Sequence, residues 1–195
     1  MLITEILAQN ARLYADETAL VERAPAENLR RRISWQKFDR SASLFAQALR
    51  ARGVTKATPV AHLLMNCIEW LPCYFGILRA GGIAVPLNFR FEAQTLLDCC
   101  ALTGSQVLLF GEEFIERIEA VKMGLDAHVK EYIYLGPEQR CPAFACQYAD
   151  FIAGYSVEDP ALPISAEDDA AYYFTSGTTG HPKAVALTHG NLEHA

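Results

Sequence analysis

The segment VAHLLMNCIEWLPCYFGILRAGGIAVPL, residues 60–87, decides the fold because it reads as strand, helix and strand in succession. Its opening, VAHLLM, is a continuous apolar run, which is typical of a strand buried on both faces of a parallel sheet. Asn66, with Glu69 three residues later, resembles a capping box, so we expect a helix to start there. Pro72 falls in an early turn of that helix, where a missing N–H costs least, and Pro86 indicates the end of the second strand.

The same alternation continues toward the C-terminus. Residues 91–104 and 112–125 have helical patterns, and residues 106–110 and 129–136 read as short apolar strands. Strands and helices that alternate with short links predict a parallel sheet with right-handed crossovers. The expected fold class is therefore α/β, with a layered, mostly parallel sheet and helices on both faces.

Toward the N-terminus, a helical pattern is followed by a short strand at residues 18–22. Ser34 then predicts the N-cap of a second helix, and Gly53 predicts its end. The basic cluster Arg30-Arg31-Arg32 reads as a solvated face.

The pattern weakens after residue 137, and SVEDPALPISAEDDA is a connector rich in proline and acidic residues. We expect an N-terminal α/β subdomain at residues 1–154 and a connector at 155–169. Residues 170–195 should form a β-hairpin and the start of a further helix near Asn191.

Composition excludes several classes of protein. The chain has 195 residues, of which 51% are hydrophobic, and 17 Lys+Arg against 23 Asp+Glu give a net charge of −6. This balance argues against a nucleic-acid partner. No stretch is long and apolar enough for a membrane span, and the N-terminus lacks the features of a signal peptide, so a cytoplasmic location is expected.

The six cysteines show neither C-x-x-C spacing nor a histidine pair at zinc-like spacing. Four of them lie in apolar helical patterns, where a free thiol behaves as a small hydrophobe. Structural thiols are therefore expected, with no protein-held metal; a zinc or redox protein is a distant alternative. The cysteines are Cys67, Cys73, Cys99, Cys100, Cys141 and Cys146.

The C-terminal stretch YYFTSGTTGHPKAVALTHGNL, residues 172–192, places small hydroxyl residues and glycines between two apolar runs. Glycines let backbone N–H groups approach an anion, and hydroxyl groups add further donors. Lys183, just after a proline, adds a positive charge. This combination indicates a loop that binds a polyphosphate, carried by a hairpin. A flexible polar linker is the alternative, but it would not explain Pro-Lys leading directly into a strand.

The loop is not a Walker A motif, because its lysine follows Gly180 by three residues and precedes a strand instead of a helix. The stretch 172–192 instead resembles the signature of the adenylate-forming enzymes, which include acyl-CoA synthetases, peptide-synthetase adenylation domains and luciferases. Residues 60–110 are similar to the N-terminal subdomain of fatty and aryl acyl-CoA synthetases. The resemblance covers nearly the whole chain, although most of its specificity lies in 172–192.

The resemblance implies a role for individual residues. The phosphate-wrapping loop would consist of Thr175, Ser176, Gly177, Thr178, Thr179 and Gly180, with Lys183 as its basic residue. Thr188 and His189 would close the motif. Ala184 stands where many members have glycine, which is a mild departure, and the family-like run from Arg79 to Gly82 is expected only to end a helix.

The family reaction joins a carboxylic acid to AMP using ATP and Mg²⁺, and a thioester with coenzyme A or a carrier thiol usually follows. The family's other reactive groups lie beyond the loop, so we expect no catalytic residue here. The chain should be an N-terminal fragment of a fatty or aryl acid–CoA ligase that does not adenylate by itself. The alternatives are part of a peptide-synthetase adenylation domain, part of an acyl-AMP ligase, or a non-catalytic binding module. Exposed strand edges also predict a homo-oligomer.

Overall fold

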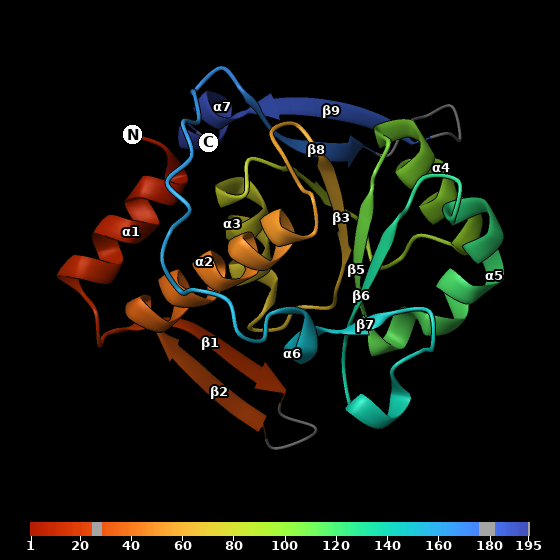
Figure 1. The fold of residues 1–195 in the computed structure, drawn as a ribbon, viewed down its shortest axis with the longest axis horizontal. Coiled ribbons are helices and arrows are strands. Elements are labelled where there is room, and N and C mark those ends of the chain that lie inside the picture. The colour runs from red at the N-terminus through yellow and green to blue at the C-terminus, as the bar shows by residue number, and fades with distance from the viewer. Residues whose placement is uncertain (25–28, 176–181, 195) are drawn as a thin grey trace.

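The computed structural model describes residues 1–24, 29–175 and 182–194 (Figure 1). Within them, a seven-stranded sheet has the order β7-β6-β5-β3-β4-β8-β9, and β1 and β2 form a separate two-stranded sheet. The strands are β1 (Thr18–Ala24), β2 (Leu29–Ser34), β3 (Pro59–Leu63), β4 (Ile83–Pro86), β5 (Val107–Gly111), β6 (Glu131–Leu135), β7 (Cys146–Gln147), β8 (Asp169–Thr175) and β9 (Lys183–Thr188). The α-helices are α1 (Ile3–Leu13), α2 (Trp35–Ala51), α3 (Trp70–Arg79), α4 (Ala93–Thr103), α5 (Ile115–Leu125), α6 (Tyr148–Phe151) and α7 (His189–Glu193).

The predicted α/β fold is confirmed. The central strand β3 pairs in parallel with both β4 and β5, and β5 pairs in parallel with β6. The helix expected at 91–104 is α4, and most of the pattern at 112–125 is α5, preceded by a short 3₁₀ turn. β8 and β9 pair antiparallel as the expected hairpin, and β8 adds to the sheet beside β4.

Helices cover both faces of the sheet, with α2 and α3 on one side and α4 and α5 on the other (Figure 1). Val60 of β3 belongs to the core under α2 and α3, which includes Phe45 and Ile77. The next residue, Ala61, belongs to the core under α4 and α5, which includes Leu96. This alternation explains the continuous apolar run of β3, since both faces of the strand are buried.

Helices α2 and α3 approach each other closely at Gly76. A methyl group built there would lie 2.8 Å from the carbonyl oxygen of Ala42 and 2.9 Å from Cδ1 of Phe45. Because the carbonyl belongs to the backbone of α2, the two helices would have to separate. We expect Gly76→Ala to lower the free energy of unfolding by about 1–3 kcal/mol, even after the gain in helix propensity.

Urea titration followed by circular dichroism measures this loss, and Gly124→Ala is the matched control. A methyl group at Gly124 would meet Cδ2 of Leu97 at 2.7 Å, the end of a flexible side chain. Leu97 can rotate away, so the control should change stability by less than about 0.5 kcal/mol. Equal effects of the two substitutions would contradict the close approach at Gly76.

His62 of β3 is completely buried against the aromatic ring of Trp70, with ring centroids 4.6 Å apart. Neither ring nitrogen has a hydrogen-bond partner among the described residues. Burial lowers the pKa of His62 from its ordinary value of 6.5 to about 3. The folded state therefore keeps the ring neutral, whereas the unfolded chain takes up a proton below pH 6.5.

Above pH 6.5, His62 is neutral in both the folded and the unfolded chain, so it does not make the unfolding free energy depend on pH. As the pH falls from 6.5 toward 3, proton uptake at His62 in the unfolded chain lowers the unfolding free energy. Between these pH values, His62 contributes about 1.4 kcal/mol per pH unit to the slope of the unfolding free energy against pH. We expect His62→Phe to reduce the pH dependence of the unfolding free energy between pH 6 and 4 by about this amount. Urea titrations at several pH values measure it, with exposed His194→Gln as the control. An unchanged slope in His62→Phe would contradict the burial of a neutral ring.

The predicted start of α3 was wrong. Helix α3 begins at Trp70, four residues after Asn66, and its N-cap, Glu69, makes no side-chain capping bond. The Glu69 carboxylate instead forms an ion pair with Arg31 of β2. Pro72 does lie in the first turn, and the predicted stop is also confirmed, because Ala80 is the C-cap and Gly81 adopts a φ of +79°.

The basic cluster forms a strand that the sequence reading missed. Arg30, Arg31 and Arg32 lie in β2, which pairs antiparallel with β1. All three side chains are exposed, as expected for a solvated face, but Arg31 also forms an ion pair with Glu22 of β1, with an Nη1–Oε2 distance of 3.1 Å. Opposite charges across the two strands thus stabilise a ribbon whose residues show little hydrophobic alternation.

The cysteines are free thiols, and Cys73, Cys99 and Cys100 are buried in helices as expected. Cys67 differs from the expectation, because it lies before α3 and is only partly buried. Across residues 1–24, 29–175 and 182–194, no helix has the length and apolar character needed to cross a membrane.

Candidate phosphate-binding site

Two of the predicted site residues lie at the base of the hairpin. Thr175 is the last residue of β8, Lys183 is the first residue of β9, and the two are paired directly across the antiparallel ladder. The strands therefore close the predicted loop at its two ends. The other predicted residues, Ser176, Gly177, Thr178, Thr179 and Gly180, lie outside the described part of the chain.

The hairpin leaves the sheet at the carboxyl edge of the parallel strands. β8 runs parallel to β4 and pairs with it at Ala84 and Ala171, so Thr175 lies at the same edge as the end of β4. Phe91, in the segment after β4, packs edge-on against Phe174, with ring centroids 6.2 Å apart. Open α/β sheets bind ligands outside this edge, and the fold places Thr175 and Lys183 there.

The side chains of Thr175 and Lys183 are both exposed. A hydroxyl group and an ammonium group on adjacent strands can both donate hydrogen bonds to a phosphate, and the ammonium adds charge. Within the described residues, no group of three His, Cys, Asp or Glu side chains is placed to hold a metal ion. The hydroxyl of Thr175 and the ammonium of Lys183 are donors that fit an anion such as phosphate.

The far end of the hairpin continues into α7. The hydroxyl of Thr188 accepts a hydrogen bond from the backbone N–H of Asn191, and the side chain of Asn191 accepts one from the N–H of Thr188. This capping box starts α7 at His189, two residues before the predicted start. His189 is buried, and its backbone N–H donates to the backbone carbonyl of Asp168. Burial lowers the pKa of the His189 imidazole.

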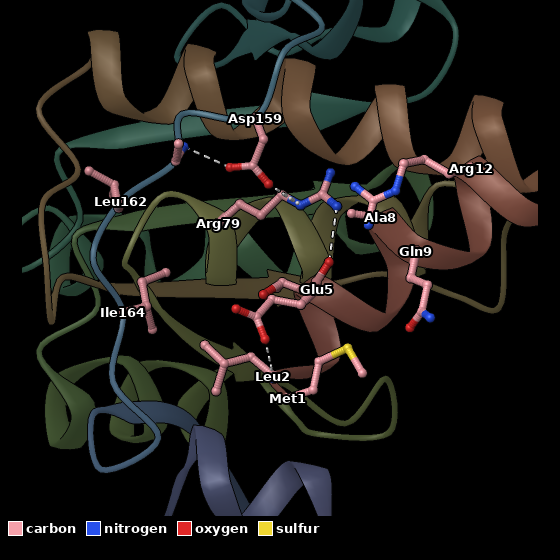
Figure 2. A pocket seen from close by; sticks show the side chains of 12 residues that line it. Met1, Leu2, Glu5, Ala8, Gln9, Arg12, Arg79, Asp159, Leu162 and Ile164 are labelled. Carbon is pink, nitrogen blue, oxygen red and sulfur yellow. Dashed lines mark hydrogen bonds and ion pairs between the residues drawn. The ribbon is translucent and has the colours of Figure 1, made fainter.

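A pocket with a volume of about 580 Å³ lies away from the hairpin, between α1 and residues 159–164 (Figure 2). Arg79 lies at this pocket, with its side chain only 1% exposed. Its Nη2 donates to Oδ1 of Asp39 at 2.6 Å, and its Nη1 donates to the hydroxyl of Ser43 at 2.8 Å. Its Nε lies 3.1 Å from Oδ2 of Asp159, which is an ion pair without hydrogen-bond geometry.

The sequence reading gave Arg79 only a helix-ending role and missed these contacts. A basic residue in the last turn of a helix is a common C-terminal signal, so nothing in the local pattern marks this side chain as buried. Together with a hydrogen bond from Nη2 to the carbonyl oxygen of Thr4, these contacts join α3 to α1, to α2 and to the segment around Asp159. Arg79 therefore has a structural role and lies outside the candidate phosphate site.

Comparisons with known proteins agree with the geometry. The family model for the AMP-binding enzymes matches residues 7–195. The chain is 27% identical over 164 residues to the long-chain-fatty-acid–CoA ligase FadD13 of Mycobacterium tuberculosis (strain H37Rv), which covers 84% of this chain and 31% of the relative. It is 33% identical over 160 residues to the feruloyl-CoA synthase of an Amycolatopsis species, covering 82% of this chain and 29% of the relative.

Among solved structures, the anthranilate CoA ligase AuaEII in complex with anthranoyl-AMP superposes with a TM-score of 0.88 at 25% identity, over 97% of this chain and 35% of that one. The fold is thus that of the N-terminal part of an acyl-CoA synthetase. The chain belongs to the family of AMP-binding enzymes. It spans about a third of the length of these relatives.

Proposed function

We propose that the chain supplies the phosphate-binding hairpin of an ATP-dependent acid–thiol ligase that forms AMP. The observation that carries the proposal is the pairing of Thr175 with Lys183 at the carboxyl edge of the sheet, where a threonine hydroxyl and an ammonium group face solvent together. These two residues, with Ser176, Gly177, Thr178, Thr179 and Gly180 between them, would hold the β- and γ-phosphates of ATP. Mg²⁺ would enter bound to the nucleotide.

The proposed reaction has two steps. A carboxylate oxygen attacks the α-phosphate of ATP, which forms an acyl-adenylate and releases pyrophosphate. The thiol of coenzyme A then attacks the acyl carbon and releases AMP. A fatty or aryl acid is the proposed substrate, and coenzyme A the proposed acceptor, because similar proteins are a fatty-acid–CoA ligase, a feruloyl-CoA synthase and an anthranilate CoA ligase.

The 195 residues are proposed to bind phosphate without performing the adenylation step. Adenylation requires groups preorganised around the α-phosphate and the attacking carboxylate, and the hairpin contributes one cation near the other phosphates. In the proposed subdomain division, residues 1–154 support the hairpin, residues 155–169 form the connector, and residues 170–195 form the hairpin and the following helix. We also propose a homo-oligomer that forms through the exposed edge of β9, the last strand in the sheet order.

The test is acid-dependent exchange of labelled pyrophosphate into ATP, catalysed by the complete product of the gene. Long-chain fatty acids, cinnamic-type acids and benzoic-type acids form the substrate panel. Exchange that appears with one of these acids, and thioester formation only on addition of coenzyme A, is the expected result. Exchange without thioester formation would instead favour a carrier protein as the acceptor. ATP binding without exchange for any acid would contradict the ligase proposal.

The same assay on the 195-residue chain should show no exchange. A signal from this chain alone would contradict the proposal that its hairpin lacks the groups required for adenylation.

A further inference from the structure

A hydrogen bond between two tyrosines joins the strand before the loop to helix α3. The hydroxyl of Tyr173, in β8, donates to the hydroxyl of Tyr74, in α3, over 3.1 Å. Tyr173 precedes Thr175 by two residues, and the two hydroxyl groups come from positions 99 residues apart in the chain. This bond therefore connects the base of the phosphate hairpin to an element buried in the main core.

Tyr74, the α3 partner in this bond, is packed into the core. Its side chain is buried, and its ring stacks on Trp70 with centroids 5.5 Å apart and planes 12° from parallel. Trp70 in turn packs against His62 of β3, the central strand of the sheet. A series of contacting rings, of which only Trp70 and Tyr74 are stacked in parallel, thus extends from the centre of the sheet to the hydroxyl that receives the bond from Tyr173.

The hairpin depends on side chains for its orientation near the loop. β8 pairs with β4 at Ala171, and the chain must continue through Tyr173 and Phe174 before it reaches Thr175. Tyr173 packs on the core under α2 and α3, whereas Phe174 packs on the opposite core and against Phe91. The end of β8 is thereby held from both faces of the sheet. Among the described residues, the Tyr173 side chain forms a directional hydrogen bond across this packing, whereas Phe174 contributes apolar contacts.

We propose that the Tyr74–Tyr173 hydrogen bond is a positioning contact that fixes the direction in which the β8–β9 hairpin leaves the sheet. It thereby places Thr175 and Lys183 for phosphate binding, a role that rests on the proposed function. Tyr74 and Tyr173 act through the strand and do not touch the nucleotide. Loss of either hydroxyl leaves both rings packed but lets the hairpin move relative to the carboxyl edge of β4.

Tyr172 provides a matched control on the neighbouring position. Its hydroxyl donates to Oδ2 of Asp169 over 3.1 Å, and Asp169 lies in the same strand. Tyr172→Phe therefore removes a tyrosine hydroxyl from β8 without breaking a connection to another element. The same change at position 74 or 173 removes the connection to α3.

The first measurement is amide hydrogen exchange across the chain. Tyr74→Phe and Tyr173→Phe should each accelerate exchange about two- to tenfold in 173–175 and 183–188, as expected for one lost hydrogen bond. The double variant should be no faster than either single variant, because both remove the same bond. Tyr172→Phe should leave exchange in these residues unchanged, and exchange in β3, β5 and β6 should be unchanged in all variants. Unchanged hairpin exchange in Tyr74→Phe would overturn the proposal.

The second measurement separates positioning from simple support. Mg·ATP titration should show affinity weakened about three- to tenfold in Tyr74→Phe and Tyr173→Phe and unchanged in Tyr172→Phe. Faster exchange with unaltered ATP affinity would overturn the positioning role. If the unsubstituted chain does not bind ATP, the proposed nucleotide site of this chain fails, and the exchange data alone then decide whether the bond directs the hairpin.

Discussion

The Arg79→Met variant is expected to lose about 3–5 kcal/mol of unfolding free energy, because it removes the charge from a buried network and leaves the partners behind. Besides Asp39 and Ser43, Nη2 of Arg79 donates to the carbonyl oxygen of Thr4 in α1 at 3.2 Å. Methionine fills much of the same volume, so the loss reports the missing donors more than a cavity. Asp159 contributes little to the total, since its side chain is 44% exposed and can be rehydrated.

Urea titration monitored by tryptophan fluorescence and circular dichroism measures the effect. Arg12→Met is the matched control, because Arg12 lines the same pocket from α1 but is exposed (Figure 2). The control should change the unfolding free energy by less than about 0.5 kcal/mol. Arg79→Lys should recover only part of the loss, since an ammonium group cannot reproduce the planar fork of donors. A loss below about 1 kcal/mol in Arg79→Met would contradict a network that joins these elements.

The sequence predicted best the elements with a clear local signal, either a run of buried apolar residues or a helix cap. The run VAHLLM at residues 60–65 indicates a strand covered on both faces, and β3 is the centre of the sheet with a core on each side. Ser34 and Gly53 delimit α2 through local capping chemistry that needs no tertiary partner. In these cases, the local signal and the final packing favour the same structure.

The errors occurred where a distant partner determines the structure. Glu69 looked like a capping residue, but it pairs with Arg31, which is 38 positions away in the sequence. β2 was missed because three of its six residues are consecutive arginines, and its pairing with β1 leaves no sign in the local pattern. Arg79 gave no local sign that α1, α2 and the connector converge on it. Such long-range contacts cannot be inferred from periodicity or capping rules.

The candidate site was predicted from composition and resemblance, and the fold adds the reason for its location. The hairpin register places Thr175 opposite Lys183, and the parallel pairing of β8 with β4 directs both to the carboxyl edge. The phosphate-binding roles of Thr175 and Lys183, like those of Ser176, Gly177, Thr178, Thr179 and Gly180, remain predictions. The sequence alone could not show the Tyr74–Tyr173 bond, because neither tyrosine has a pattern that distinguishes it from other core aromatics.

Lys183→Ala is expected to weaken Mg·ATP binding by about 10- to 100-fold, because it removes the ammonium group at the base of the proposed phosphate loop. A hydrogen bond to a charged group contributes about 1.5–3 kcal/mol, which corresponds to this range of affinity. Lys183→Arg keeps the charge and should retain most of the binding, although the planar fork of arginine fits a single phosphate contact differently. Titration calorimetry on the chain measures both variants.

Lys37→Ala is the control for loss of a positive charge, because Lys37 is exposed on α2, away from the hairpin. The ATP affinity of Lys37→Ala should match that of the unsubstituted chain. Both are measured at the same ionic strength, because salt screens the interactions of surface charges. Raising the salt concentration should weaken binding by the unsubstituted chain more than binding by Lys183→Ala, since the variant has lost a charge contact. Equal ATP affinity of Lys183→Ala and the unsubstituted chain would show that the ammonium group does not contact phosphate. The site would then have to be placed elsewhere on the carboxyl edge of the sheet.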